Sequence, residues 1–264
     1  MRLGTLLFIS TLLTAEQVQY GSVAASVIES RLKLSSADNA ARAEILEKLF
    51  KDAGCEHLAE QTVSKKGQPN IICTMPGEAD TVILVGAHFD TRTPSEGVAD
   101  NWSGAALLPS LFEALKRTQR KHTFVFIGFT DEEKGLLGSK HYVRKLSKEE
   151  KANIIAMVNL DTIGLGPLNV WASHANKELT GFLIAASKTL KMPLTAIEIA
   201  GVGSTDSESF ADTKIRRIAI SSVTRDNFRV LHSKNDRLDA MNLPEYYDSY
   251  RVLSLYLAFL DQKL

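Results

Sequence analysis

Short apolar runs alternate along the chain with segments in which apolar residues recur every three or four positions. The run at 81–86 is rich in β-branched residues and is flanked by turn-forming residues, which predicts a buried strand that ends at His88. The same criteria predict further strands at 124–129, 154–160, near 169–172, near 195–199 and at 217–221.

The segments between these strands show helical periodicity, which predicts that they form helices. Helices are expected at 38–50 and from Asp100 or Ser103 to 115. A further helix should follow residues 130–133 and run through about 142–146, and others are expected at 176–190, 207–211 and 244–260. Strands at 57–63 and 70–75, joined by a turn-rich segment, predict a hairpin at the edge of the sheet. Alternating strands and helices imply right-handed crossovers, so we expect an α/β fold: a three-layer sandwich with a mixed, mainly parallel central sheet flanked by helices.

Length and composition indicate one globular catalytic domain, which we place at 26–264. Lys plus Arg and Asp plus Glu balance at 31 each, so charge gives no indication of a nucleic-acid partner. Residues 1–25 combine a positive start with an apolar centre, which fits a signal peptide or an ordinary N-terminal helix. A signal would make the protein secreted or periplasmic, and otherwise it would be cytoplasmic. No apolar run approaches ~20 residues, so no membrane span is expected.

Two cysteines, Cys55 and Cys73, are present. In an exported protein they would form a disulfide, whereas two free thiols in a cytosolic enzyme would give the same sequence. Their spacing matches neither a C-x-x-C motif nor a zinc finger.

Imidazole and carboxylate side chains follow several predicted strands at the point where each strand ends. They are His88, Asp100, Glu132, Glu133, Asp161 and His232. The carboxyl ends of parallel strands share one edge of the sheet, where α/β proteins bind ligands, so these residues should converge. Two imidazoles and several carboxylates without cysteine suit a divalent metal, most simply zinc, and a bridging carboxylate can hold two ions ~3.5 to 4 Å apart.

Several motifs occur in an order that resembles one known family, the co-catalytic di-zinc aminopeptidases, whose relatives include glutaminyl cyclases. The motifs are His88-Phe89-Asp90, Asp100-Asn101-Trp102-Ser103-Gly104, Asp131-Glu132-Glu133-Lys134-Gly135-Leu136-Leu137-Gly138-Ser139, Asn159-Leu160-Asp161 and Leu231-His232-Ser233. They span roughly residues 80 to 240, most of the chain.

The resemblance implies a role for each of these residues. It implies a zinc-dependent hydrolase that removes N-terminal residues from peptides with a free N-terminus, and two zinc ions per chain. His88 and Asp161 would bind one ion, Glu133 and His232 the other, and Asp100 would bridge them. Glu132 would be the general base, and Asp90 would accept the second ring N–H of His88.

Two other functions fit the same motifs. A glutaminyl cyclase would act on N-terminal glutamine with a single zinc, but such relatives usually depart from the element that this chain keeps as Asn101, Ser103 and Gly104. A non-catalytic domain that retains the fold would be expected to lose a ligand or Glu132, and none is lost. The residue preference, the choice of zinc over manganese or cobalt, and the oligomeric state stay open.

Other residues have less specific interpretations. Asp206 could contact a substrate amine or cap a helix, and Trp102 and Phe228 could line an apolar pocket or only pack. Gly104 and Gly135 could let the backbone pass close to the metals or only form turns. The remaining histidines match no motif and are interpreted as structural or solvated: His57, His122, His141 and His174.

Overall fold

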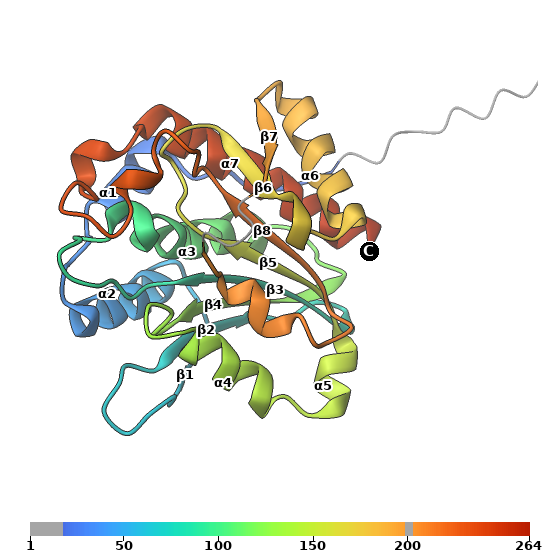
Figure 1. Cartoon of the computed structure of the whole chain (residues 1–264). Coiled ribbons are helices and arrows are strands. Elements are labelled where there is room, and N and C mark those ends of the chain that lie inside the picture. Colours follow the sequence, from blue (N-terminus) through green and yellow to red (C-terminus); the bar gives the residue numbers. More distant parts are fainter. Residues whose placement is uncertain (1–17, 199–202) are drawn as a thin grey trace, which may run out of the picture.

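A computed structural model describes residues 18–198 and 203–264 of the chain (Figure 1). Eight strands form one sheet in the order β1-β2-β4-β3-β5-β8-β6-β7. Their bounds are β1 (His57–Gln61), β2 (Asn70–Met75), β3 (Ala79–His88), β4 (His122–Phe129), β5 (Ile154–Leu160), β6 (Leu168–Trp171), β7 (Leu194–Ile197) and β8 (Arg216–Ser221). The predicted end of one strand at 199, and residues 1–17 of the predicted N-terminal segment, lie outside the described residues.

The middle of the sheet is parallel. Strands β4, β3, β5 and β8 are neighbours that run in the same direction. Antiparallel pairs lie on both sides of them, because β2 pairs antiparallel with β4 and β6 pairs antiparallel with β8. The prediction of a mixed, mainly parallel sheet is confirmed, and the predicted hairpin of β1 and β2 forms one edge of it.

Seven α-helices surround the sheet in the described part of the chain. They are α1 (Ala25–Leu32), α2 (Asn39–Asp52), α3 (Ser103–Lys116), α4 (Leu137–Lys145), α5 (Lys148–Asn153), α6 (Lys177–Leu190) and α7 (Leu243–Lys263). A short π-helix, η1 (Val98–Trp102), precedes α3, and a 3-10 helix, η3 (Asp206–Phe210), stands where a short helix was predicted. Among the described residues, no helix is long and apolar enough to cross a membrane.

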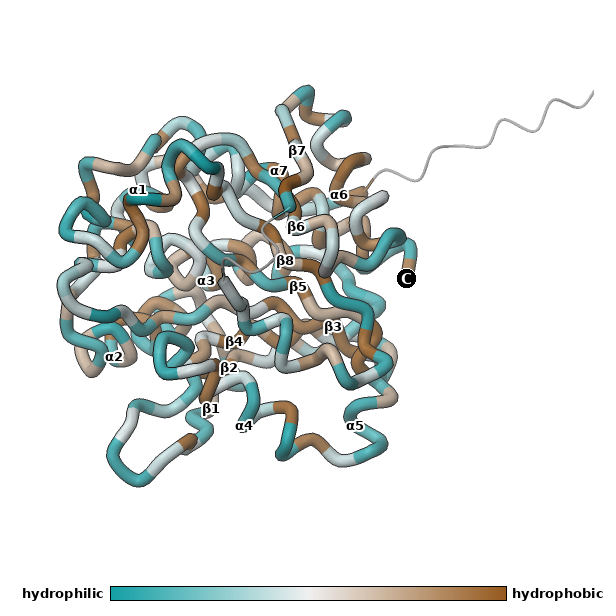
Figure 2. Tube along the Cα trace, in the orientation of Figure 1, coloured by the Kyte–Doolittle hydropathy of each residue, from teal (hydrophilic) through white to brown (hydrophobic). Residues whose placement is uncertain are grey.

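Two hydrophobic cores lie on opposite faces of the sheet. Ile83 and Val85 of β3 join a large core with α1, α2, α3, α6 and α7, whereas Leu84 joins a smaller one with Tyr142 of α4 and Phe210 of η3. This alternation follows from the two-residue period of a strand. Figure 1 shows α4 and α5 on the opposite side of the sheet from α3 and α7, and in Figure 2 hydrophobic residues gather along the central strands. The three-layer prediction is therefore confirmed.

Cys55 and Cys73 form a disulfide that joins the segment after α2 to strand β2. Their Cα atoms are 6.2 Å apart, which lies in the usual range for a disulfide. Of the two alternatives for this pair, the structure contains the disulfide.

Candidate active site

The residues singled out at the strand ends meet at one edge of the sheet. His88 ends β3, Glu132 and Glu133 follow β4, and Asp161 follows β5. Asp100 lies in η1, in the connection from β3 to α3, and His232 lies in the loop after β8. These side chains line one cavity of about 310 Å³.

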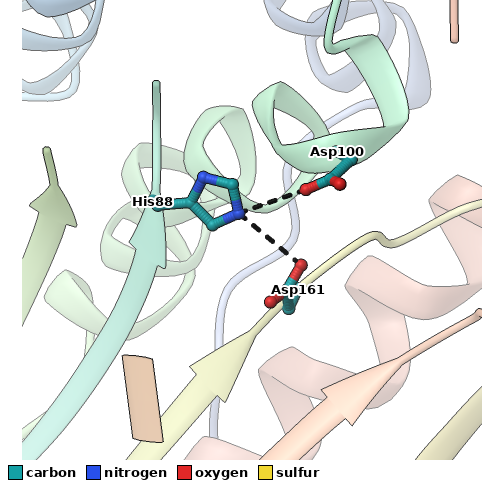
Figure 3. A group of neighbouring side chains, drawn as sticks. All are labelled: His88, Asp100 and Asp161. Carbon is teal, nitrogen blue, oxygen red and sulfur yellow. Dashed lines mark ion pairs between the residues drawn. The ribbon is translucent and has the colours of Figure 1, made fainter. Parts of the chain in front are cut away.

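The proposed ligands form two sets that share Asp100. In the first, the Nε2 atom of His88 lies 3.2 Å from Oδ1 of Asp100 and 3.7 Å from Oδ1 of Asp161 (Figure 3). In the second, Nε2 of His232 lies 3.1 Å from Oδ2 of Asp100 and 3.2 Å from Oε1 of Glu133. Each oxygen of Asp100 thus faces a different imidazole, which is the arrangement that a bridging carboxylate requires.

The chemistry of these groups fits divalent metal ions. Within each set the nitrogen and oxygen atoms lie within 4.8 Å of one another. Glu133 Oε1 is buried without a hydrogen bond, although it lies close to His232. Arg92 is the only lysine or arginine among the described residues that line the cavity, so it leaves most of the negative charge uncompensated. Imidazole nitrogens with carboxylate oxygens and no thiolate favour zinc or a similar ion.

The side chains of the two sets perturb one another strongly. Burial alone would lower the pKa of His88, but the carboxylates of Glu132, Asp100 and Asp161 raise it well above its usual value. The neighbouring carboxylates of Asp100 and Glu133 raise the pKa of His232 to about 10. Burial opposes ionisation of Asp100, but both histidines hold its pKa far below the usual range. In the absence of a cation, protons on the imidazoles therefore balance part of the negative charge.

Glu132 differs from the ligands because no imidazole lies within ion-pair distance of it in the described structure. It lines the same cavity as they do. Burial raises the pKa of Glu132, the charge of His88 opposes this rise, and the carboxylates of Asp206, Asp161 and Asp100 add to it. A carboxyl group with a raised pKa beside a metal site is suited to accept and return a proton.

Asp206 is completely buried and does not cap η3. The hydroxyl of Thr205 caps that helix, and the Asp206 carboxylate oxygens are buried without a hydrogen-bond partner. Burial raises the pKa of Asp206 to about 7. The capping interpretation is therefore wrong, and Asp206 is a buried acid that acts electrostatically on Glu132.

The structure places the Asp90 carboxylate beside the second ring nitrogen of His88, as predicted, and gives Asp90 further contacts. The shortest contact of Nδ1 of His88 is with the backbone carbonyl of Asp90, at 3.2 Å, and the carboxylate Oδ1 is at 3.5 Å. The carboxylate also accepts the backbone amides of Glu132, at 3.0 Å, and Glu133, at 3.2 Å. Asp90 thus orients His88 mainly through its main chain and holds the two glutamates through its side chain.

The residues after Asp100 connect it to the Asp161 segment. Asn101 Oδ1 accepts the amides of Thr162 and Gly104, and its Nδ2 donates to the carbonyl of Leu160. The hydroxyl of Ser103 accepts the amide of Ile163 and donates to the carbonyl of Ala99. Asn101, and neither Asp100 nor Ser103, thus accepts an amide in the first turn of α3. The side chains of Asn101 and Ser103 fix the Asp100 segment relative to the segment after Asp161.

Gly104 and Gly135, the two motif glycines considered above, serve different purposes. A Cβ atom on Gly104 would lie 2.7 Å from the carbonyl oxygen of Leu160, so only glycine lets α3 approach the end of β5 this closely. Gly135 has a φ of 97° and open space around its Cα, so its role is the turn itself.

Apolar side chains also line the cavity. Phe228 lines it together with Trp171, Val223 and Leu231. Trp102, the other aromatic residue singled out in the sequence, is completely buried and donates its indole N–H to the carbonyl of Arg31, so it only packs. Of the histidines outside the motifs, His57 lies on the exposed edge strand, His122 bonds Thr81 and His141 bonds Arg144, whereas the side chain of His174 lies outside the described residues.

Two residues that support the site were not identified from the sequence. Asp236 is completely buried and accepts the amides of Ala99 and Asp100. Arg42, on α2, is also completely buried and donates to the carbonyls of Phe89 and Gly97. Their partners are backbone atoms, which have no sequence signature. The only sequence signals were the charge of Arg42 in an otherwise apolar helix face and the position of the acid Asp236 shortly after His232.

Comparisons with known proteins agree with this geometry. The model of the family described as "Peptidase family M28" matches residues 70–257. An aminopeptidase of Pseudomonas aeruginosa is 37% identical over 110 residues, which cover 41% of this chain and 20% of that protein. The chain thus aligns with about a fifth of the length of this curated relative.

Solved structures share the fold at lower sequence identity. The LapA aminopeptidase of Legionella pneumophila superimposes with a TM-score of 0.80 at 20% identity, covering 92% of this chain and 73% of that one. A glutaminyl cyclase of Porphyromonas gingivalis superimposes with a TM-score of 0.69 at 18% identity, covering 91% and 97%. The fold is therefore common to hydrolases and cyclases.

Proposed function

The chain belongs to peptidase family M28, and from this premise we propose that it is a zinc-dependent aminopeptidase that removes N-terminal residues from peptides. The single observation that carries the proposal is the pair of ligand sets that share the two oxygens of Asp100, with Glu132 beside them. The aminopeptidase relative from Pseudomonas aeruginosa supports the same activity.

The proposed metal ligands are His88 and Asp161 for one ion, Glu133 and His232 for the other, and Asp100 for both. Zinc bound there would act as a Lewis acid toward the scissile carbonyl and would lower the pKa of water. The carboxylate of Glu132 would accept the proton of the attacking water and pass it to the departing amine nitrogen. Asp90 would keep Glu132 in position through the Glu132 amide.

The apolar wall formed by Trp171, Val223, Phe228 and Leu231 would receive the side chain of the N-terminal residue. The same cavity of about 310 Å³ also holds both ligand sets, so the N-terminal residue and the proposed metal ions would share one space.

A panel of chromogenic aminoacyl amides, together with a peptide that begins with glutamine, tests this function. We expect release of the chromophore, loss of release with a chelator and recovery with zinc. Cyclisation of the glutamine peptide without amide hydrolysis would identify a cyclase instead. No turnover of either substrate by the zinc-loaded protein would contradict both functions.

We also propose that the protein acts in an oxidising compartment, as a secreted or periplasmic enzyme. The disulfide between Cys55 and Cys73 supports this location, since such bonds persist mainly outside the reducing cytosol. Cell fractionation with thiol labelling tests it, and fully reduced protein in the cytosolic fraction would contradict it.

A further inference from the structure

Asp236 connects the loop that carries His232 to the backbone of Asp100. Its Oδ1 accepts the amide of Ala99 at 2.6 Å, and its Oδ2 accepts the amide of Asp100 at 3.1 Å. Oδ2 also accepts the hydroxyl of Ser95 at 3.1 Å. The carboxylate thus holds two successive amides and a hydroxyl on the segment that leads to the bridging ligand.

The side chain of Arg42 holds the same segment from another side. The guanidinium of Arg42 donates to the carbonyls of Phe89, at 2.8 Å, and Gly97, at 2.9 Å, and it also bonds the carbonyl of Glu96. These carbonyls lie along the connection from His88 to Asp100. Arg42 therefore binds the carbonyl groups of this connection, and Asp236 binds amides at its end.

Asp236 is itself fixed to the His232 loop by a short turn. Its amide donates to the carbonyl of Ser233, the residue after His232, at 3.1 Å. The Nε2 atom of His232 and the Oδ2 atom of Asp100 are 3.1 Å apart, and a shift of Asp236 would therefore change this distance. Both residues belong to one ligand set.

We propose that Asp236 is a positioning residue for the metal centre: it fixes Asp100 relative to His232 so that both can bind the same ion. This inference rests on the proposed function, because it assumes that the two sets bind metal. Buried groups that orient ligands commonly change metal affinity about 10- to 100-fold when they are replaced.

A purely structural role is the competing explanation, and the chain contains a matched control for it. The carboxylate of Asp261 also accepts two successive amides, those of Lys121 at 3.1 Å and His122 at 2.9 Å. These amides lie at the start of β4, whereas the metal ligands lie beyond its other end. Asp261→Asn thus removes the same kind of interaction without touching the site.

The experiment compares the wild type, Asp236→Asn and Asp261→Asn, each with and without zinc. Zinc affinity is measured by competition with a chelator of known affinity, and Tm by circular dichroism. We expect Asp236→Asn to bind zinc about 10- to 100-fold more weakly and to show a smaller rise in Tm on zinc addition. Asp261→Asn should lower Tm equally with and without zinc and keep wild-type affinity.

Wild-type zinc affinity in Asp236→Asn, or a loss of Tm that is equal with and without zinc, would overturn the inference. If this variant does not fold, Ser95→Ala decides, since it removes one bond to the carboxylate. Weaker zinc binding in Ser95→Ala supports the inference, and unchanged binding overturns it. A wild-type protein that binds no zinc would instead overturn the proposed function.

Discussion

The carboxylate of Asp90 accepts the backbone amide of Glu132 at 3.0 Å. The same carboxylate also accepts the amide of Glu133, so one side chain sets the position of both the proposed general base and a proposed ligand. Since an aspartate has acceptors only and an asparagine side chain has one acceptor, Asp90→Asn breaks one of these bonds.

We therefore expect Asp90→Asn to lower kcat/KM about 10- to 100-fold, with a larger effect on kcat than on KM. Steady-state kinetics on an aminoacyl amide, with zinc content measured on the same samples, checks this. Unchanged kcat with lower zinc content would instead mean that Asp90 serves only His88.

Glu132→Gln keeps the size of the side chain and removes its ability to accept a proton. We expect kcat to fall about 100- to 10,000-fold, the usual contribution of a general base, while zinc content stays at the wild-type level. Metal analysis and kinetics on one preparation test both parts. Near-wild-type turnover would exclude Glu132 as the base.

Replacing Asp161 and replacing Asp100 should have different effects on the zinc content of the protein. Asp161 belongs only to the His88 set, whereas Asp100 belongs to both sets. We expect about two zinc ions per wild-type chain, about one in Asp161→Ala and almost none in Asp100→Ala. Elemental analysis after dialysis measures this, and equal zinc loss in both variants would argue against a bridging role for Asp100.

The disulfide between Cys55 and Cys73 should contribute measurably to stability. The two cysteines are 18 positions apart, and closing a loop of this length in the unfolded chain corresponds to about 3 kcal/mol. The free energy of unfolding of the Cys55→Ser/Cys73→Ser variant should fall by about this amount in urea titrations. Wild-type protein in reductant serves as the control, and a variant as stable as the oxidised wild type would contradict the estimate.

His122 should make stability depend on pH. Burial, and then repulsion from Lys121, lower the pKa of His122 below its usual 6.5 in the folded chain. The unfolded chain therefore binds a proton first as pH falls, so the contribution of His122 is complete above about pH 6.5 and is lost as pH falls toward the folded-state pKa.

The measurement compares the free energy of unfolding of wild type and His122→Gln between pH 5 and pH 8, both saturated with zinc. We expect the wild type to lose more stability on acidification than the variant. Parallel pH curves would show that His122 does not titrate differently in the two states.

The sequence predicted those features that depend on side-chain pattern. The apolar runs of β3, β4 and β5 identified the parallel strands, and the edge that these strands share predicted the convergence of His88, Glu133 and Asp161. Helix α1 was not predicted, because its residues adjoin a segment that resembles a signal peptide.

Features that depend on backbone partners escaped prediction. The carboxylates of Asp90 and Asp236 bind amides of segments distant in the sequence, and any residue supplies such an amide. The burial of Asp206 was equally hidden, because an acid at the start of a short helix resembles a cap. Three-dimensional contact, not residue type, distinguishes these acids from ordinary loop residues.

The dispersion of the ligands over the ends of β3, β4, β5 and β8 has a kinetic consequence. Each ligand set joins segments that follow different strands, so we expect the sets to be completed only after the parallel strands have paired. Interactions that form after the transition state of folding slow unfolding and leave the folding rate unchanged. Bound zinc should therefore slow unfolding and prolong the lifetime of the native state, while the rate of folding stays unchanged.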